Sequence, residues 1–327
     1  MPTCTTPRVS IGLPVYNGEN YLAATLEALC SQTYTDFELI ISDNASTDRT
    51  AEICGDYASH DRRLRYVRNE RNIGAGANYN RTFTLATGEL FKWHAHDDLL
   101  APTFLEKCVA VLDAHPDAVL CQSLVEYIDA EGKSLGVYNN RLPGADACQS
   151  SVRFAAAILV PHSCTDFFGL TRRASLLGTI LHADFHGTDR ALIAELAIRG
   201  RLLKVNEPLF LNREHPARYT RTANRPQDRQ LWHAGQVTRR HYPVWRLYRE
   251  YWRMIPRNLT DPWERWRCYG HLLHWWLVNW NGGRMAADVL AVLHPDIVAR
   301  AQQLKQRWFA PEPGPGSVKS QRHGRHH

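Results

Sequence analysis

Two adjacent carboxylates, Asp97 and Asp98, follow a short apolar run at residues 89–94. Adjacent carboxylates repel one another and raise each other's pKa unless a cation offsets their charge. A third acid, Asp43, follows another apolar run, at residues 37–42. Acids gathered at neighbouring strand ends form an oxygen-rich site for Mg²⁺ or Mn²⁺, which takes further ligands from water and substrate phosphates. The pair alone is also compatible with an exposed turn, or with Asp98 capping the helix that follows.

The elements that must position these acids follow from hydrophobic periodicity. Strands are expected at residues 8–15, 37–42, 64–67, 89–94 and 118–125, and helices at 21–31, 49–58, 74–86 and 102–114. This alternation predicts an α/β fold with a mostly parallel central sheet flanked by helices and joined by right-handed crossovers. Ligands of such sheets bind beyond the carboxyl ends of the strands, where the three acids are expected.

The last hundred residues differ in composition, because nine of the ten tryptophans lie between Trp232 and Trp308. They fall on helices expected at residues 228–253, 262–281 and 284–308. We therefore predict an α/β domain that carries the acids, a helical Trp-rich C-terminal extension, and a disordered tail. The expected bounds of these three parts are residues 1–225, 226–310 and 311–327.

The composition, 44% hydrophobic and 22% charged residues, is that of a soluble globular protein. No apolar run approaches the roughly 18 residues that cross a bilayer. Residues 1–8 lack the apolar core of a secretory signal. The eight cysteines include no Cys-x-x-Cys pair and are expected to be reduced thiols. These features predict a cytoplasmic protein.

The net charge of +6 is concentrated between Arg199 and Arg257, where 14 Lys and Arg accompany four acids. Such a surplus suits an anionic partner, although a solvated helical face would explain part of it. We expect no nucleic-acid partner, because no nucleic-acid-binding motif accompanies these residues. The tryptophans leave three interpretations open: core packing, peripheral contact with the inner face of a membrane, or a sugar-stacking or subunit surface of a homo-oligomer.

Four stretches, at residues 9–22, 28–50, 69–80 and 96–102, resemble the family-2 glycosyltransferases in sequence, order and spacing. The resemblance extends over about residues 8–215. It implies the GT-A fold of nucleotide-diphospho-sugar transferases, with Mg²⁺ or Mn²⁺ as cofactor. The implied activity is transfer of a sugar, with inversion, from a nucleotide-diphospho-sugar donor to a hydroxyl of a saccharide or lipid-linked acceptor. Polysaccharide, glycolipid or cell-envelope glycan synthesis is the expected setting.

The resemblance also implies which residues bind the donor. The nucleotide-sugar site would comprise Pro14, Tyr16 and Asn17 at the base and ribose, Asp43 and Asn44 at the base, the loop from Gly74 to Asn80 over the nucleotide, and Asp97 and Arg213. Asp98, Asp97 and His215 would hold the metal, with Asp98 as the better candidate for direct contact. The family more often reads Asp-Ala-Asp-Asp where this chain reads Ala-His-Asp-Asp at residues 95–98. The roles of the two remaining acids are therefore left open.

The family's general base corresponds to Asp189, in the stretch at residues 187–200. The reaction needs such a group, because an acceptor hydroxyl must lose its proton as it attacks the sugar. The alternative is that Asp189 only stabilises the start of a helix through its charge. Glu195 is a weaker candidate on another face of the same helix. His215 would ligate the metal or bind the leaving phosphate, and arginines such as Arg213 would neutralise the diphosphate.

Three other functions were weighed against this one. His94 and His96 share the His-x-His spacing of zinc hydrolases, but the His-x-His-x-Asp-His pattern fails at residues 98 and 99. A nucleotidyltransferase would bring a basic, Gly-rich phosphate loop, and residues 14–19 contain no base. A non-catalytic relative that binds sugar or lipid without turnover remains open.

Overall fold

The computed structural model describes residues 6–218 and 242–293, together with residues 222, 228, 231–233 and 235. The predicted tail at 311–327 and both ends of the predicted extension lie outside the described residues, as does the boundary at 225. That division of the chain stays a prediction.

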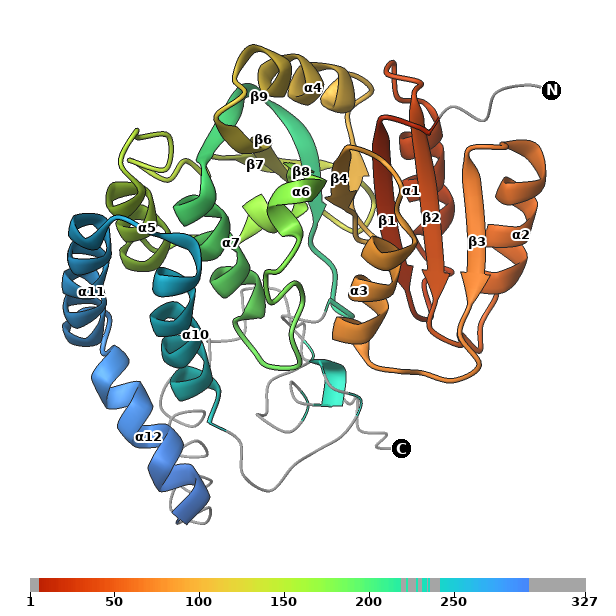
Figure 1. The fold of residues 1–327 in the computed structure, drawn as a ribbon. Coiled ribbons are helices and arrows are strands. Elements are labelled where there is room, and N and C mark those ends of the chain that lie inside the picture. The colour runs from red at the N-terminus through yellow and green to blue at the C-terminus, as the bar shows by residue number, and fades with distance from the viewer. Residues whose placement is uncertain are drawn as a thin grey trace, which may run out of the picture.

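The first half of the chain builds the predicted parallel sheet (Figure 1). In chain order its elements are β1 (Val9–Val15), α1 (Leu22–Cys30), β2 (Phe37–Asp43), α2 (Thr50–His60), β3 (Leu64–Arg68), α3 (Ala75–Leu85) and β4 (Leu90–Trp93). The four strands lie side by side in the order β3-β2-β1-β4, and each neighbouring pair is parallel. Their carboxyl ends therefore meet at one edge, as expected. All seven elements match the predicted ones to within two residues.

The second half extends the same sheet with strands of mixed direction. It comprises β5 (Leu99–Leu100), α4 (Phe104–Ala114), β6 (Ala118–Ile128), β7 (Ser134–Tyr138), α5 (Ser150–Leu159), the 3₁₀ helix η1 (Thr165–Phe168), β8 (Leu170–Arg172), α6 (Arg173–Leu176), α7 (Thr188–Arg199) and β9 (Arg201–Arg213). The order continues as β4-β8-β6-β9-β5, with β7 beside β6. Only β6 and β9 run parallel here, so the mostly parallel sheet is confined to the first half.

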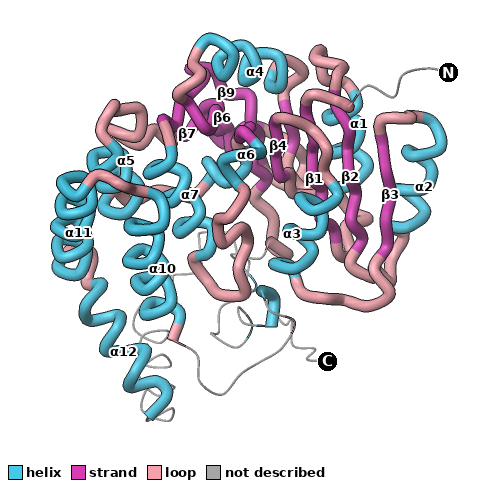
Figure 2. Tube along the Cα trace, viewed as in Figure 1, coloured by secondary structure: helices cyan, strands magenta, loops and turns pink. Residues whose placement is uncertain are grey.

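The sheet is covered by helices on both faces (Figure 2). Alternate residues along each strand point to opposite faces, so Leu39 and Ile41 pack with α1, α2 and α4, whereas Ile40 packs with α3, α5 and α7. In this three-layer arrangement the helices lie on the two faces of the sheet. Asp43, Asp97 and Asp98 lie at the carboxyl ends of its strands, between the two helix layers.

Three further helices follow: α10 (Pro243–Asn258) packs against α7, α11 (Pro262–Leu277) packs against α5, and α12 (Asn281–Leu293) packs against α10 and α11. Tyr251 and Trp275 of these helices belong to the same hydrophobic core as the sheet. A buried polar contact strengthens the junction, because the fully buried Glu195 of α7 accepts hydrogen bonds from Arg257 and Asn258. The Glu195 carboxylate is therefore occupied by structural hydrogen bonds, which excludes it as the general base of the reaction.

Within the residues that the structure describes, no helix has both the length and the apolar character needed to cross a bilayer.

Candidate active site

The acidic pair lies in the turn between β4 and β5, and the second acid is held from across the sheet. β5 pairs with β9 so that Leu99 lies opposite Leu211. This register brings the buried carboxylate of Asp98 to Asn212, whose Nδ2 donates to both carboxylate oxygens at 3.0 Å. The backbone N–H of Arg213 donates to the same carboxylate at 2.9 Å. Asp98 is therefore fixed by β9 and does not cap α4.

Asp97 points to the more open side of the turn. Its Oδ2 lies 2.9 Å from Nε2 of His215, the residue two positions beyond β9. The His215 ring packs on Tyr21, with ring centroids 4.8 Å apart. The structure thus brings together the three predicted metal ligands, Asp97, Asp98 and His215, from segments more than one hundred residues apart.

The two carboxyl groups differ in electrostatic environment. Burial and the neighbouring charge of Asp97 raise the pKa of the Asp98 carboxyl. Burial would also raise the pKa of Asp97, but the hydrogen bond from His215 and the charges of His96 and Arg218 outweigh it and lower that pKa. Asp97 is therefore the acid that stays ionised most readily. It is also the better placed of the two to meet a cation, because the Asp98 oxygens are already hydrogen-bonded.

These residues fit a divalent cation as part of a ligand set. Carboxylate oxygens are the ligands that Mg²⁺ prefers, and it is commonly bound by one or two of them together with substrate phosphates. His215 Nε2 hydrogen-bonds Asp97 Oδ2 at 2.9 Å, so it would have to leave this contact to ligate a metal. Among the described residues, no group of three or more His, Cys, Asp or Glu side chains is arranged to hold a metal.

Two arginines surround the pair and do different things. The Arg213 guanidinium donates to the backbone carbonyls of Asp97, Asp129 and Ala130, so its predicted contact with phosphate would require it to leave these partners. Arg218 donates to the side-chain oxygen of Asn212 at 2.7 Å and forms an ion pair with Glu214. Its charge lowers the pKa of both acids of the pair.

The predicted base pocket lies at the ends of β1, β2 and β3. Asp43 is fully buried, and its carboxylate accepts hydrogen bonds from Tyr66 Oη at 2.8 Å and from the backbone of Ser46 at 2.8 Å. Arg68 of β3 lies 3.3 Å from the same carboxylate. The Asp43 carboxylate is therefore held in place beside β3.

The turns that follow β1 and β2 are joined by polar contacts. Asn17 adopts a left-handed backbone with φ 51°. Its side-chain oxygen accepts from the backbone N–H of Thr47 at 2.9 Å. Tyr16 beside it is 46% exposed, whereas Pro14 is buried within β1. Tyr16 is thus available to a ligand at this edge, and Pro14 supports the strand beneath it.

The loop that leads into α3 is tied to the same region. Asn44 accepts a hydrogen bond from the backbone of Ile73 at 2.9 Å, and Gly74 has the left-handed φ of 82° that starts the helix. Asn80, in contrast, uses both ends of its amide on the backbone of His182, each at 2.9 Å. Its observed role is to hold the loop before α7, so any contribution to a nucleotide pocket is indirect.

Asp189 lies in the first turn of α7, where its Oδ1 accepts from the backbone N–H of Arg190 at 2.8 Å. Its position relative to the pair is defined through Tyr79 of α3. Burial raises the pKa of the Tyr79 hydroxyl most, and the charges of Asp97, Asp98 and Asp189 raise it further. The Tyr79 hydroxyl is therefore close enough to all three acids for their charges to act on it.

The His-x-His element does not form a zinc site. His94 is fully buried in the sheet, and its Nε2 lies 3.1 Å from the backbone carbonyl of Asp98, to which it donates. Burial and the nearby Lys92 lower the pKa of His94 well below its ordinary value, so the ring is neutral. His94 positions the turn that carries the pair and is not available as a zinc ligand.

Sequence reasoning missed three residues that shape the site: Asn212, Tyr66 and Tyr79. Asn212 interrupts an apolar run at the end of β9, and that interruption is a usable signal. Tyr66 and Tyr79 carry no local signal, because each looks like an ordinary packed aromatic of a strand or helix.

An α/β sheet with acids gathered at the carboxyl ends of its strands is typical of nucleotide-binding transferases. Residues 10–176, just over half of the 327 residues, match the model of glycosyl transferase family 2. The chain belongs to this family, as its motifs predict.

Two relatives illustrate the extent of the match. EpsE of Bacillus subtilis is 40% identical over 110 residues, 33% of this chain and 40% of EpsE. An uncharacterized glycosyltransferase of Methanocaldococcus jannaschii is 34% identical over 131 residues, 39% of this chain and 45% of its own length. The chain thus matches less than half the length of these relatives.

Solved structures confirm the predicted GT-A fold. TarS of S. aureus, residues 1–349 in complex with UDP, is similar with a TM-score of 0.59 and 17% identity, over 81% of this chain and 70% of TarS. TarS in complex with UDP-GlcNAc gives a TM-score of 0.59 and 18% identity, over 82% and 71%. The mannosyltransferase PcManGT of Pyrobaculum calidifontis, in complex with GDP-Man and Mn²⁺, gives 0.51 and 18%, over 94% and 84%.

His94 predicts how stability responds to acid. Because its pKa in the folded protein lies below the ordinary 6.5, the unfolded chain takes up the proton first as the pH falls. The free energy of unfolding is therefore retained above about pH 6.5 and decreases below it, by up to about 1.4 kcal/mol per pH unit. Urea unfolding of His94→Gln from about pH 7 to about pH 5 is expected to show a shallower loss than wild type. The exposed control His60→Gln should follow wild type, and equal slopes for all three would exclude this role.

Proposed function

We propose that the protein is a metal-dependent, inverting glycosyltransferase that moves a sugar from a nucleotide-diphospho-sugar to an acceptor hydroxyl. The observation that supports it best is the arrangement of acids: Asp43 lies at the end of β2, Asp97 and Asp98 lie beyond β4, and Asp189 lies in the first turn of α7, where its charge acts on the same Tyr79 hydroxyl as the pair. These positions correspond to the three tasks of the reaction, which are base recognition, diphosphate binding and proton removal.

The donor would lie over the carboxyl ends of β1, β2 and β4. Asp43 would accept a hydrogen bond from the base, with the exposed Tyr16 and the side chains of Asn17 and Asn44 around base and ribose. Fold neighbours bind UDP, UDP-GlcNAc or GDP-Man, which supports a uridine or guanosine diphosphate donor here. The sugar would extend from Asp97 toward Asp189.

A divalent cation held by Asp97 and His215, with Asp98 beside them, would neutralise the donor diphosphate as it leaves. Arg218 would add positive charge at the same place, since it already acts on both acids. Fixed positive charge directed at a departing diphosphate lowers the barrier to its departure.

Asp189 would remove the proton from the acceptor hydroxyl as that oxygen attacks the sugar carbon. It is held in the first turn of α7 by its contact with the Arg190 backbone, and its charge acts on the same Tyr79 hydroxyl as the charges of the pair. Attack with Asp189 as the base, and departure of the diphosphate on the Asp97 side, would be one in-line displacement and would invert the sugar configuration.

The alternatives differ in what they require. Nucleotidyl transfer would need a basic phosphate loop after β1, and residues 16–19 contain only Tyr, Asn, Gly and Glu. A non-catalytic binder would have no use for an acid in the position of Asp189, yet only measured turnover separates it from the enzyme.

We further propose that the outer face of α11 contacts an anionic bilayer surface, where a lipid-linked acceptor for glycan synthesis would be met. The inner face of α11 is buried through Leu272 and Trp275. Its outer face is also apolar, with Trp263, Trp266 and Leu277 between 69% and 72% exposed at helical spacing. We expect a helix that is apolar on both faces to contact a second apolar surface in addition to the core. Tryptophan is favoured at membrane interfaces.

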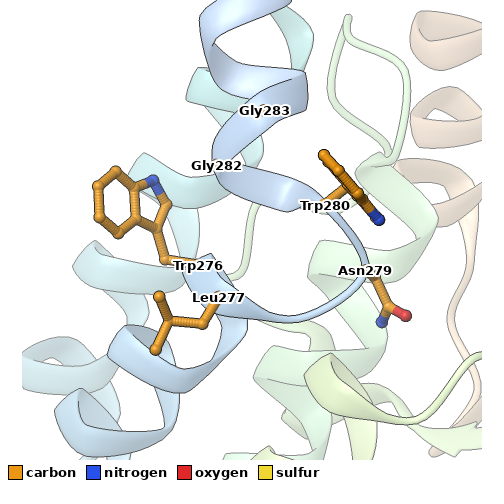
Figure 3. Close-up of a pocket in the computed structure, with 6 residues that line it drawn as sticks. All are labelled: Trp276, Leu277, Asn279, Trp280, Gly282 and Gly283. Atoms are coloured by element: carbon orange, nitrogen blue, oxygen red, sulfur yellow. The ribbon is translucent and has the colours of Figure 1, made fainter.

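The turn between α11 and α12 continues this apolar surface (Figure 3). Trp276 and Trp280 project on either side of it, around an open cavity of about 490 Å³. Trp280 is 85% exposed and has a left-handed φ of 56°, an unfavourable backbone for a bulky residue. On the neighbouring α10, Arg249 and Arg253 are exposed beside Trp252. These cations complement an anionic lipid surface.

The role of Asp189 is tested by Asp189→Asn, which keeps the side-chain shape and removes the base. Transfer is expected to fall about 10²- to 10⁴-fold, whereas binding of the nucleoside diphosphate is unchanged. The matched control Asp184→Asn alters an exposed acid in the loop before α7 and should keep full activity. Wild-type turnover by Asp189→Asn would remove this residue from the mechanism.

The donor and metal sites are tested by calorimetric titration with UDP and with GDP, each with and without Mn²⁺. One nucleotide is expected to bind more tightly with Mn²⁺ in wild type, and Asp97→Asn should abolish that enhancement because it removes the ionised ligand. The exposed Asp56→Asn in α2 serves as the control. Metal-linked binding with slow donor hydrolysis supports the enzyme. Binding without any hydrolysis or transfer supports the non-catalytic alternative.

The docking surface is tested by sedimentation with vesicles of phosphatidylglycerol and phosphatidylcholine. The full-length protein should bind them, less so in high salt, and Trp263→Ser/Trp266→Ser should weaken binding by more than about tenfold, since buried apolar area contributes ~25 cal/mol per Å². Leu135→Ser/Val137→Ser removes exposed apolar residues from β7 instead and should leave binding intact. Absence of vesicle binding, or a change from dimer to monomer in the tryptophan variant, would contradict a lipid partner.

A further inference from the structure

A second cavity, of about 530 Å³, lies between the first turn of α7 and the C-terminal helices. We call it the α7–α12 cavity. It is lined by Gly187 and Arg190 of the α7 entry, Val244 and Leu247 of α10, and Arg284 and Asp288 of α12. α10 packs against α7 on one side and against α12 on another (Figure 1). Its volume is within the ~300–1,000 Å³ typical of small-molecule sites.

The charged side chains that line this cavity differ in how many hydrogen bonds they already make within the protein. Asp288 accepts a hydrogen bond from the backbone N–H of Val244 at 2.8 Å, in the first turn of α10. The positive end of that helix thus offsets its charge, and burial raises the pKa of its carboxyl. Arg190 uses one Nη on the carbonyl of His162, and a guanidinium has four further N–H donors. Arg284 lies one helical turn from Asp288; its Nη1 donates to Asn281 Oδ1 at 3.4 Å, and its charge opposes the rise in the Asp288 pKa. With Arg190 and Arg284 against Asp288, the charged residues that line the cavity sum to a positive charge.

The remaining wall is apolar and aromatic. Val160, Leu247 and Trp275 line it, and Trp275 is held in place by stacking on Tyr248, with ring centroids 5.6 Å apart. A cavity whose lining combines arginine cations with an indole and aliphatic carbons suits an anionic saccharide, whose ring has both apolar C–H faces and polar edges.

The position of the cavity relative to Asp189 indicates which substrate the cavity could bind. Gly187 and Arg190, which line it, lie on either side of Asp189 in the sequence. In an in-line displacement the acceptor approaches from the side opposite the leaving diphosphate, and therefore from beyond Asp189. The α7–α12 cavity lies next to that approach, on the side of the first turn of α7 that faces the C-terminal helices.

We infer that the α7–α12 cavity binds the acceptor, and that the acceptor is a saccharide carrying an anionic group, a phosphate or a carboxylate, held by Arg190 and Arg284. This inference rests on the proposed function for the position of the reaction, but anion binding in the cavity is measurable without turnover. The C-terminal helices then complete the acceptor site in addition to packing on the core.

The test is calorimetric titration of the full-length protein, saturated with whichever of UDP or GDP binds and with Mn²⁺, so that the donor site is filled. Glucose 1-phosphate, glucuronate and glucose are the probes. One or both anionic sugars should bind at least about tenfold more tightly than glucose, and which of them does so distinguishes phosphate from carboxylate. Arg284→Gln should remove that preference, whereas the exposed control Arg62→Gln should keep it.

A second variant pair controls for folding. Ala287→Trp fills the cavity from exposed α12, and its neighbour Ala286→Trp adds the same side chain outside the cavity. Ala287→Trp should lose anionic-sugar binding with nucleotide binding intact, and Ala286→Trp should behave as wild type. Equal binding of all three sugars, or full binding by Ala287→Trp, would overturn the inference. Anionic-sugar binding by a protein that binds neither nucleotide would overturn the proposed function and leave the cavity assignment standing.

Discussion

The buried carboxylate of Asp98 is the contact on which the site depends. A carboxylate out of water is costly unless its oxygens are hydrogen-bonded, and here both receive the Asn212 amide while one also receives the Arg213 backbone N–H. These donors come from the end of β9, which pairs with β6 along one edge and with the short β5 along the other. The turn that carries the pair is thus attached to both halves of the sheet. His215 is delivered beside Asp97 by the same strand.

That attachment stabilises an arrangement that is electrostatically unfavourable. Burial and the charge of Asp97 raise the pKa of Asp98, and the Arg213 backbone N–H, Arg218 and Asn212 oppose that rise. Against the effect of burial, His215, His96 and Arg218 lower the pKa of Asp97. Perturbed groups of this kind cluster where charge is needed for chemistry. In the proposed function, a donor diphosphate with its cation would add to this compensation.

The sequence predicts those elements well whose structure is determined by neighbouring residues. It predicts less well the elements that depend on pairing between distant strands. Strands β1 to β4 and their helices follow from periodicity and turn residues, and the family motifs locate the acids. The antiparallel β5, β7 and β8 are short or exposed and have no distinctive pattern. Asn212 and Tyr79 act on residues that are distant in the sequence or on other elements, so only the fold identifies them. Arg213 and Asn80, expected at the donor, instead bind backbone carbonyls and the His182 backbone.

The Trp-rich segment shows why composition alone left its role open. Tyr251 and Trp275 pack in the core, whereas Trp263 and Trp280 are exposed, although all lie within thirty residues of one another. Because α11 is apolar on both sides, helical spacing alone does not tell the buried aromatic residues from the exposed ones. The structure has to show first which face is buried. The inner face of α11 packs on α5 and α10, and α12 packs on α10 and α11, so that these helices form a cavity with the first turn of α7. The outer face of α11 is exposed. A helix pair that binds the core, an acceptor and a membrane would bring a surface-bound acceptor to the base without any movement of the sheet.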